Sequence, residues 1–191
     1  MVFTGIVQRI GVAHFDKNTS KLYVTVDETF WSKSQTGDSV AINGVCLTLL
    51  NAPTGPTAEF FVMEETLSKT NLGELSLEDS LKYVNVEHAL RVGDSLGGKH
   101  LLKLLLTNDH SCNWVLLFSP GHTVTGHVDG VATITSIVYR NDGSKDLWVD
   151  LSSFKSNMIY IVHKGSICLD GKSFNSITRL VRAKYFRFFR C

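Results

Sequence analysis

The sequence is poor in proline, in net charge and in long apolar runs. Its 191 residues include 3 prolines, and 19 basic against 18 acidic side chains leave a formal charge of +1. That balance argues against a general polyanion binder, which concentrates basic residues. No apolar run approaches the roughly 18 residues that a membrane-spanning helix needs, and no P-loop or dinucleotide-binding glycine motif is present. An apolar fraction of 43% also excludes a disordered chain.

The cysteines and histidines lack the spacings of a disulfide framework or a metal site. No C-x-x-C pair appears among Cys46, Cys112, Cys168 and Cys191, so we expect reduced thiols in a cytosolic protein. No zinc-ligand spacing relates His100, His110, Cys112, His122 and His127, so we expect no metal. Residues 1–5 contain no cationic stretch that leads into an apolar run, so no secretion signal is expected.

What the sequence does contain is a series of short strands separated by turns. Apolar and polar residues alternate over 21–27, as is typical of a half-buried strand. Asn43-Gly44 separates two apolar runs and predicts a β-hairpin. Further strands are expected at 59–63 and 81–87, with a helical turn at 64–68 between them. This spacing predicts a small closed β-barrel over residues 1–90.

The same pattern occurs a second time along the chain. Residues 39–47 return at 166–174, the segment Thr4-Gly5-Ile6-Val7 returns as Thr125-Gly126-His127-Val128, and an alternating strand returns at 146–151. Because these matching segments occur in the same order in both halves of the chain, they predict two copies of the same barrel. After Thr48 the first copy continues to residue 90, whereas only 16 residues follow the equivalent Asn175. The second copy is therefore expected to lack its closing strands.

Several motifs, taken in order, strongly resemble riboflavin synthase. They are Phe3-Thr4-Gly5-Ile6-Val7, Asn43-Gly44-Val45-Cys46-Leu47-Thr48, Glu65-Thr66-Leu67, Thr70-Asn71-Leu72-Gly73, Val84-Asn85-Val86-Glu87, Gly126-His127-Val128-Asp129 and residues 164–171. The resemblance covers 1–98 and 122–176. It implies an all-β fold, a tandem repeat of two small Greek-key six-stranded β-barrels, with the second incomplete here. We expect the first barrel at 1–96, a junction with an atypical insert at 97–121 and the truncated second barrel at 122–191.

The resemblance also implies an activity and an assembly. The family converts two molecules of 6,7-dimethyl-8-ribityllumazine into riboflavin and 5-amino-6-(ribitylamino)uracil, without a metal or organic cofactor. It works as a homotrimer, with each site between the first barrel of one subunit and the second barrel of a neighbour. We expect a cytoplasmic enzyme with no nucleic-acid or membrane partner. Two alternatives stay open: a lumazine- or flavin-binding protein without turnover, and an inactive splice form.

Site residues follow from the same resemblance. The catalytic candidates are Cys46, Thr48, His127, Ser173 and Asp170. The first-barrel pocket is expected to contain Gly5, Ile6, Val7, Cys46, Leu47, Thr48, Phe61, Val62, Met63, Glu64, Glu65 and Thr66. The second-barrel pocket is expected to contain Gly126, His127, Val128, Lys164, Ser173, Phe174 and Asn175. Simpler roles compete with these: Cys46 as a small core residue, Asp170 as a turn former before a glycine, and Lys164 as a solvated charge.

The sequence departs from the family pattern at three places. The 23 residues from Lys99 to Gly121 interrupt an expected Gly-Gly-His, Asn175 replaces a threonine, and the chain from Ile177 is a basic, aromatic tail. We hypothesise that 99–121 and 181–191 derive from unspliced introns, because removing the first segment joins Gly98 directly to His122. The alternative is a genuine loop insertion and a divergent tail. We expect the tail to be a solvated, poorly ordered end.

Overall fold

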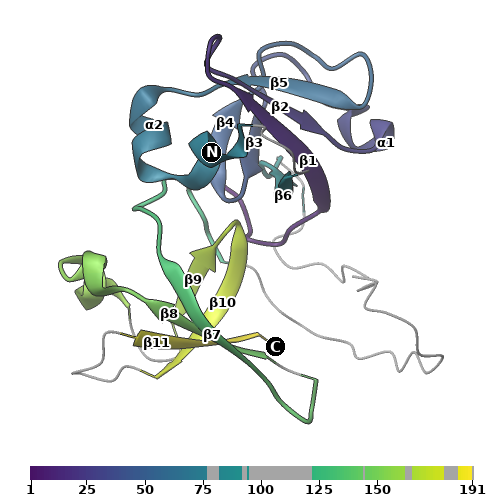
Figure 1. The fold of residues 1–191 in the computed structure, drawn as a ribbon. Helices are drawn as coiled ribbons and strands as arrows, with labels where there is room; N and C mark the ends of the chain where they lie inside the picture. Colours follow the sequence, from purple (N-terminus) through teal and green to yellow (C-terminus); the bar gives the residue numbers. More distant parts are fainter. Residues whose placement is uncertain are drawn as a thin grey trace.

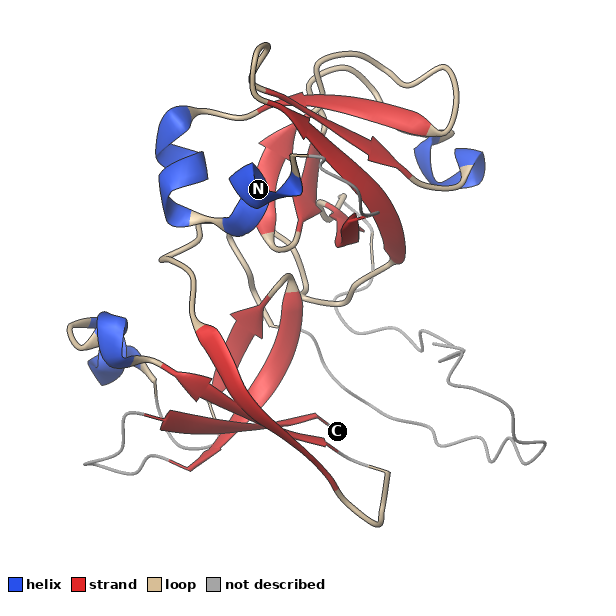
Figure 2. Cartoon of the chain, viewed as in Figure 1, coloured by secondary structure: helices blue, strands red, loops and turns tan. Residues whose placement is uncertain are grey.

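The computed structural model describes residues 1–76, 82–91, 94, 122–143, 145–161, 165–178 and 185–190. The insert at 99–121 and Lys164 lie outside these ranges, so the hypothesis about the insert stays a prediction. The described residues form two antiparallel sheets joined through a narrow junction (Figures 1 and 2). None of the described helices is long and apolar enough to cross a membrane.

The first sheet is a nearly closed barrel of six strands. These are β1 (Arg9–Asp16), β2 (Lys21–Thr25), β3 (Ser39–Ile42), β4 (Val45–Thr48), β5 (Thr57–Phe61) and β6 (Lys82–His88). Their order is β4-β3-β6-β1-β2-β5, and the crossover that places β6 between β1 and β3 is the expected Greek-key feature. A bridge between Leu49 and Phe60 brings the two outer strands together. Short helices α1 (Glu28–Trp31), α2 (Glu64–Lys69) and η1 (Asn71–Leu75) complete it.

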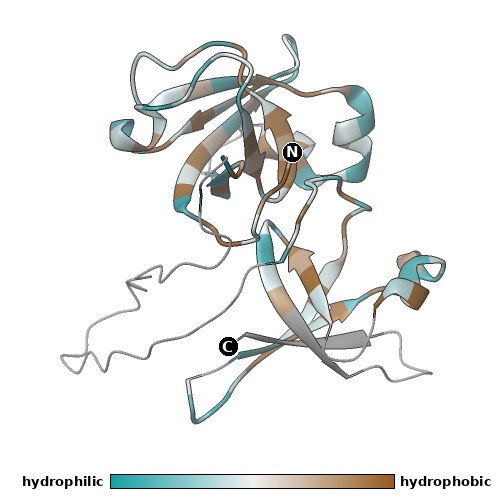
Figure 3. Ribbon diagram, turned by 180° about the vertical axis from the view of Figure 1, so that it is seen from behind, coloured by the Kyte–Doolittle hydropathy of each residue, from teal (hydrophilic) through white to brown (hydrophobic). Residues whose placement is uncertain are grey.

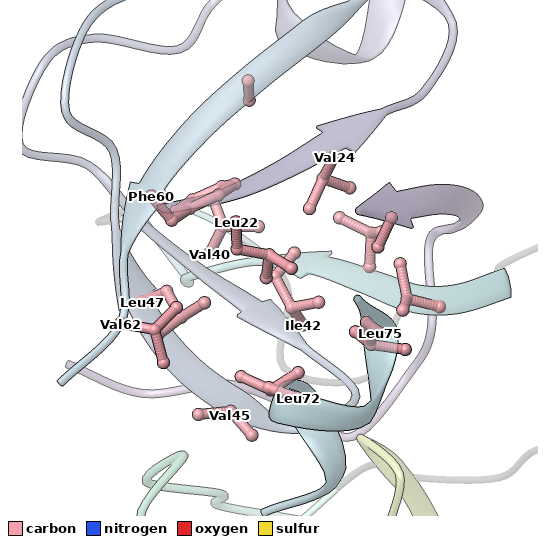
Figure 4. Close-up of a cluster of buried hydrophobic side chains, with 14 of the residues drawn as sticks. Leu22, Val24, Val40, Ile42, Val45, Leu47, Phe60, Val62, Leu72 and Leu75 are labelled. Atoms are coloured by element: carbon pink, nitrogen blue, oxygen red, sulfur yellow. The ribbon is translucent and has the colours of Figure 1, made fainter. Parts of the chain in front are cut away.

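Alternating side chains of these strands fill the barrel with one apolar core. Leu22 and Val24 of β2, Val40 and Ile42 of β3, and Phe60 of β5 are fully buried and lie together in Figure 4. The period of two seen in the sequence is the period at which a strand presents residues to one face. Each such side chain contributes about 1.5–3 kcal/mol by leaving water, so the core holds the barrel together.

The β3–β4 hairpin forms as the Asn-Gly pair predicted. Asn43 has φ 48° and Gly44 has φ 80°, which are the left-handed conformations that a two-residue type I′ turn requires. The Asn43 side-chain oxygen accepts a hydrogen bond from the Asn85 backbone N–H at 2.8 Å. The turn is thereby attached to β6 as well as to its own strands.

The second sheet repeats this arrangement with one strand fewer. Its strands are β7 (Thr133–Tyr139), β8 (Lys145–Asp150), β9 (Ser166–Leu169), β10 (Lys172–Thr178) and β11 (Tyr185–Arg190), in the order β7-β8-β11-β10-β9. The 3-10 helices η2 (Ser152–Phe154) and η3 (Asn157–Tyr160) follow β8. Among the described residues no strand joins β7 to β9, which is the place that β6 takes between β1 and β3. The expectation of an incomplete second barrel is confirmed.

The tail corrects one expectation from the sequence. Residues 185–190 are a strand rather than a poorly ordered end, because β11 pairs with β8 from Tyr185 opposite Asp150 to Arg190 opposite Lys145. Its other side pairs with β10. In the first barrel β5 pairs with β2 in the same way, so β11 occupies the position of β5. The missing counterpart is that of β6.

The core of the second sheet is correspondingly small. Its buried cluster consists of Val149, Leu151 and Phe174, with half-buried neighbours such as Leu147 and Ile167. Seen from behind, apolar residues recur along the strands of the barrel that carries the N-terminus (Figure 3). Every residue of β7 is exposed, so this strand adds little to the second core.

Candidate functional site

The two sheets meet through two equivalent backbone contacts. In one the first copy supplies the acceptor, and in the other the second copy supplies it. The Ser173 backbone N–H donates to the Gly5 carbonyl at 2.8 Å, and the Cys46 N–H donates to the Gly126 carbonyl at 3.0 Å. Gly5 and Gly126 are equivalent in the repeat, and so are Cys46 and Ser173. Two equivalent contacts with exchanged partners define a local two-fold axis. The junction therefore places each copy's Thr-Gly segment against the hairpin of the other copy.

The axis passes between two further pairs of equivalent residues. Phe3 and Val124 form an antiparallel bridge, with N–H to carbonyl distances of 2.8 and 3.0 Å. The hairpin turns at Gly44 and Gly171 touch directly: a Cβ on Gly44 would lie 2.6 Å from the Gly171 nitrogen. Asn85 of β6 donates through Nδ2 to the Asp170 carbonyl at 2.8 Å. The first copy thus contributes β6 to this contact. The described part of the second copy has no strand equivalent to β6.

Glycine is required at both Thr-Gly positions for two reasons. Gly5 has φ 72° and Gly126 has φ 80°, which side chains rarely adopt. A Cβ on Gly126 would also lie 2.5 Å from the Cys46 Cβ, and one on Gly5 would lie 3.0 Å from the Ser173 Cβ. The backbone must come close at these points, and this closeness brings candidate side chains from both copies to one junction.

On the first barrel, the predicted pocket residues divide between the core and the outer surface. Leu47 of β4 and Val62 after β5 are buried in the core. Because successive residues of a strand point to opposite faces, Cys46, Thr48 and Phe61 face away from it. Phe61 is 52% exposed, and Met63, which follows β5, is 61% exposed. The outward set forms a surface with apolar side chains, a thiol and a hydroxyl next to the junction.

The remaining first-barrel candidates differ in how far they are buried. Gly5 is buried, Ile6, Val7 and Thr66 are half-buried, and Glu64 and Glu65 are exposed at the start of α2. Val128, expected in the second-barrel pocket, packs against the core of the first barrel. The second copy thereby supplies part of the wall on the first barrel.

On the second copy, Ser173 has a partner that the sequence did not single out. The Oγ of Ser173 lies 2.7 Å from Nδ1 of His122 in a hydrogen bond. Burial lowers the pKa of His122, so the ring favours its neutral form, in which it can accept a proton. Its neighbour His127, a predicted catalytic residue, is exposed, and its N–H donates to the Thr125 hydroxyl at 3.3 Å. The sequence marked His122 through the interrupted Gly-Gly-His motif and as one of the residues weighed as metal ligands, but gave it no role at the site.

Other predicted residues of the second copy lie close by. Phe174 is 8% exposed in the small core, and Asn175 pairs through its backbone with Ser166 and Phe189. Asp170 has φ 47° at the hairpin turn, matching 48° at Asn43. The conformation therefore fits the turn role, while a catalytic role for Asp170 stays a prediction. Lys164 lies outside the described residues.

A buried carboxylate fixes the N-terminal segment of the first barrel. Glu87 of β6, 3% exposed, accepts hydrogen bonds from the Thr4 N–H at 2.6 Å, the Thr4 hydroxyl at 2.7 Å and the Gly5 N–H at 3.1 Å. Burial raises the pKa of Glu87, while these donors act in the opposite direction. The sequence predicted a strand here but not this role. Through it, β6 holds Gly5 in place against Ser173.

The thiols in the described part of the chain differ in their environment. Cys46 and Cys168 are both free. Burial raises the pKa of the Cys168 thiol to about 11, with the negative charge of Glu87 adding to the effect. The Cys168 thiol therefore stays protonated at neutral pH, and the thiolate, which is the nucleophilic form, is scarce. Within the described ranges, no group of three or more His, Cys, Asp or Glu side chains is placed to hold a metal ion.

The repeat and its junction define a class of protein. A family model described as "Lumazine binding domain" matches residues 4–89 and 125–187, one match on each sheet. The second match includes part of β11 and extends beyond residue 176, where the motif resemblance ended. The chain is therefore a tandem pair of lumazine-binding domains.

Relatives narrow this class to one family. A riboflavin synthase of Actinobacillus pleuropneumoniae is 33% identical over 175 residues, covering 90% of this chain and 67% of the relative. One from Chlamydia pneumoniae is 34% identical and covers 93% and 73%, and one from Escherichia coli is 31% identical and covers 90% and 68%. The chain belongs to the riboflavin synthase family.

Solved structures agree on the fold. A crystal structure of LumP complexed with 6,7-dimethyl-8-(1'-D-ribityl) lumazine matches with a TM-score of 0.69 and 19% identity, covering 98% of this chain and 85% of that one. LumP complexed with riboflavin matches equally well, at 20% identity. Both support the two-barrel architecture.

Proposed function

We propose that the chain is a riboflavin synthase that dismutates two 6,7-dimethyl-8-ribityllumazine molecules. The products are riboflavin and 5-amino-6-(ribitylamino)uracil. The observation that carries the proposal is the exchange of partners at the junction, where Cys46 lies against Gly126 and Ser173 against Gly5. Two equivalent half-sites suit a reaction whose two substrates are the same molecule, and membership of the family supports this reading.

The reaction requires that the two substrate rings be oriented and that protons be transferred. A four-carbon unit moves from one ring to the other, so the rings must be held face to face, a methyl group must lose a proton, and a ring carbon must accept a nucleophile. We assign proton transfer to Ser173 with His122, whose lowered pKa keeps it ready to accept a proton near neutral pH. Cys46 and Thr48 act at the other half-site, with His127 and Asp170 as further candidates.

Binding uses the exposed walls beside these groups. Phe61 and Met63 offer apolar surface to a flat heterocycle. We expect backbone groups of the pocket walls to pair with its uracil-like edge, as the resemblance implies. Ile6, Val7, Glu64, Glu65 and Thr66 on the first copy, and Phe174, Asn175 and Lys164 on the second, remain binding candidates on the strength of the resemblance.

Assembly and location belong to the same proposal. The junction within one chain positions its two half-sites, and the family pattern completes each site with a half-site from a neighbouring subunit. We therefore propose the homotrimer of the family. Cysteine usage supports a cytoplasmic location, because both described thiols are free.

Variants that separate the half-sites test the proposal. Cys46→Ala and Ser173→Ala should each lower kcat by about 10²-fold, the usual share of one proton-transfer group. Cys168→Ala is the matched control, because it removes the other described thiol from a position without a chemical role. If sites are shared between subunits, mixing the two inactive variants restores part of the activity. Unchanged turnover in both variants would contradict the assignment.

A second function is favoured by the incomplete second barrel. Within the described residues, nothing joins β7 to β9, and no described helix takes the place of α2 beside β11. An intact first barrel could bind one lumazine while the second fails to present its partner. Titration followed by lumazine fluorescence distinguishes the two: a bound ligand without riboflavin formation identifies a binding protein.

A further inference from the structure

Two consecutive peptide groups near the N-terminus connect a buried carboxylate to the hydrogen-bonded side chains of Ser173 and His122. The first peptide group contains the Thr4 carbonyl and the Gly5 N–H. The second contains the Gly5 carbonyl and the Ile6 N–H. Each peptide group is planar and nearly rigid, so its N–H and its carbonyl move together. A group that fixes the N–H therefore also fixes the residue that the carbonyl holds.

The first peptide group links Glu87 of β6 to His122. Its N–H, that of Gly5, donates to Glu87 Oε2 at 3.1 Å. Its carbonyl, that of Thr4, accepts a hydrogen bond from the His122 N–H at 3.0 Å. Hydrogen bonds on both sides of one amide polarise it and strengthen each other. The backbone of His122 is thus attached to the carboxylate through a single peptide group.

The second peptide group links Glu87 to Ser173 with one more step. The Gly5 carbonyl accepts a hydrogen bond from the Ser173 N–H at 2.8 Å. On its other side the Ile6 N–H donates to the Thr4 hydroxyl at 3.1 Å, and that hydroxyl donates to Glu87 Oε1 at 2.7 Å. The Thr4 hydroxyl is both acceptor and donor, so it relays the position of the carboxylate to Ser173.

Both series of hydrogen bonds end at side chains that must meet. The Oγ of Ser173 lies 2.7 Å from Nδ1 of His122, although the two residues are 51 positions apart in the chain. Such a hydrogen bond weakens steeply when its alignment is lost. Glu87 is 3% exposed, and a buried carboxylate must keep its hydrogen bonds. It is therefore a fixed point to which both backbones are tied.

We propose that Glu87 is a positioning residue, which aligns Ser173 with His122 through these two peptide groups. The role rests on the proposed function, because it names the group that orients the proton-transfer pair assigned there. Glu87 belongs to the first barrel, whereas Ser173 and His122 belong to the second copy. The half-site of the second copy therefore depends on the first barrel of the same chain for its geometry.

Thr4 offers a matched pair of variants that separates this role from stability. Thr4→Val keeps the shape of the side chain and removes the hydroxyl relay, whereas Thr4→Ser keeps the hydroxyl. Side-chain nitrogen NMR of the purified full-length chain reports on the His122 ring, and His122→Gln identifies its signal. The shift that Ser173→Ala causes marks the loss of the contact between Oγ and Nδ1. We expect Thr4→Val and Glu87→Gln to reproduce that shift. Thr4→Ser and Glu59→Gln, the latter at the ion pair with Lys21, should keep the wild-type signal.

Turnover of the same variants gives a second measure. Thr4→Val and Glu87→Gln should lower kcat by up to about 10²-fold at nearly unchanged KM, because misalignment of a proton-transfer pair affects the reaction more than binding. Thr4→Ser should keep most of the wild-type kcat. If the wild type forms no riboflavin, the proposed function fails, and the ring signals alone decide on the positioning role. A wild-type His122 signal in both Thr4→Val and Glu87→Gln, or a shift as large in Thr4→Ser as in Thr4→Val, would overturn the proposal.

Discussion

The two copies of the repeat have similar strand order but differ greatly in how much they bury. β6 lies between β1 and β3 in the first copy and brings Val84 and Val86 into a core that includes Phe60 and Trp31. The described second copy has no such strand, and its buried cluster is reduced to Val149, Leu151 and Phe174. One strand thus decides whether a sheet of this topology closes around a core.

The largest effect should come from removing an aromatic ring from the closed core. Phe60→Ala leaves a cavity at a fully buried position and should cost about 3–5 kcal/mol in the free energy of unfolding. Phe174→Ala in the open sheet should cost less, because its few neighbours can move into the space. Urea unfolding followed by fluorescence measures both losses. Equal losses would contradict the difference between the copies.

The next effect concerns the junction that both copies share. Gly126→Ala combines a left-handed φ with a Cβ too close to Cys46, and should cost about 3 kcal/mol. Gly143→Ala is the control, because Gly143 also has φ 80° but has no atom within 4 Å of an added Cβ. Thermal unfolding should rank Gly126→Ala well below Gly143→Ala in stability. Identical values would show that close packing at the junction has no energetic weight.

A smaller loss should follow when β6 can no longer hold the N-terminal segment. Glu87→Gln keeps the shape of the side chain but replaces one acceptor oxygen with a donor, which faces either the Thr4 N–H or the Gly5 N–H. Leaving such buried groups unsatisfied costs about 1–3 kcal/mol. Glu59→Gln, which breaks the partly exposed ion pair with Lys21, should cost much less, because solvent screens such a pair. Denaturant unfolding of both variants checks the order.

The smallest effect is a pH dependence located in the first barrel. His88 stacks on Phe30 at 4.1 Å between ring centroids, and burial lowers its pKa below the usual 6.5. The unfolded chain therefore binds more protons than the folded one as pH falls below 6.5, and stability decreases on acidification. His88→Gln should flatten this part of the stability curve between pH 7 and 5. A slope that is the same in the variant would assign the effect to other groups.

Local patterns in the sequence predicted those strands and turns that are specified by residues close together in the chain. The alternation at 21–27 became β2, the Asn43-Gly44 pair became the β3–β4 turn, and the repeat located β8 and β9. The tail was missed because no alternation marks 185–190, and its strand exists only through pairing with β8 and β10. The site contacts that the sequence did not predict also join residues far apart in the chain.

At the candidate site, the sequence named residues but not their partners. Cys46 and Ser173 were expected from motifs, whereas the pairing of Ser173 with His122 spans 51 positions in the chain. Glu87 was named as part of a strand and of a family motif but without a role, because its hydrogen bonds reach residues 82 and 83 positions away. Such contacts depend on how the two copies dock, which local patterns do not encode.

The central claim is that two equivalent half-sites carry out one dismutation. The direct measurement is the stoichiometry of turnover by the purified 191-residue chain, with lumazine, riboflavin and pyrimidine quantified together by chromatography. The account predicts that two molecules of 6,7-dimethyl-8-ribityllumazine disappear for each riboflavin formed, with 5-amino-6-(ribitylamino)uracil released in equal amount. Lumazine that binds the chain and is recovered unchanged, with no riboflavin formed, would contradict it.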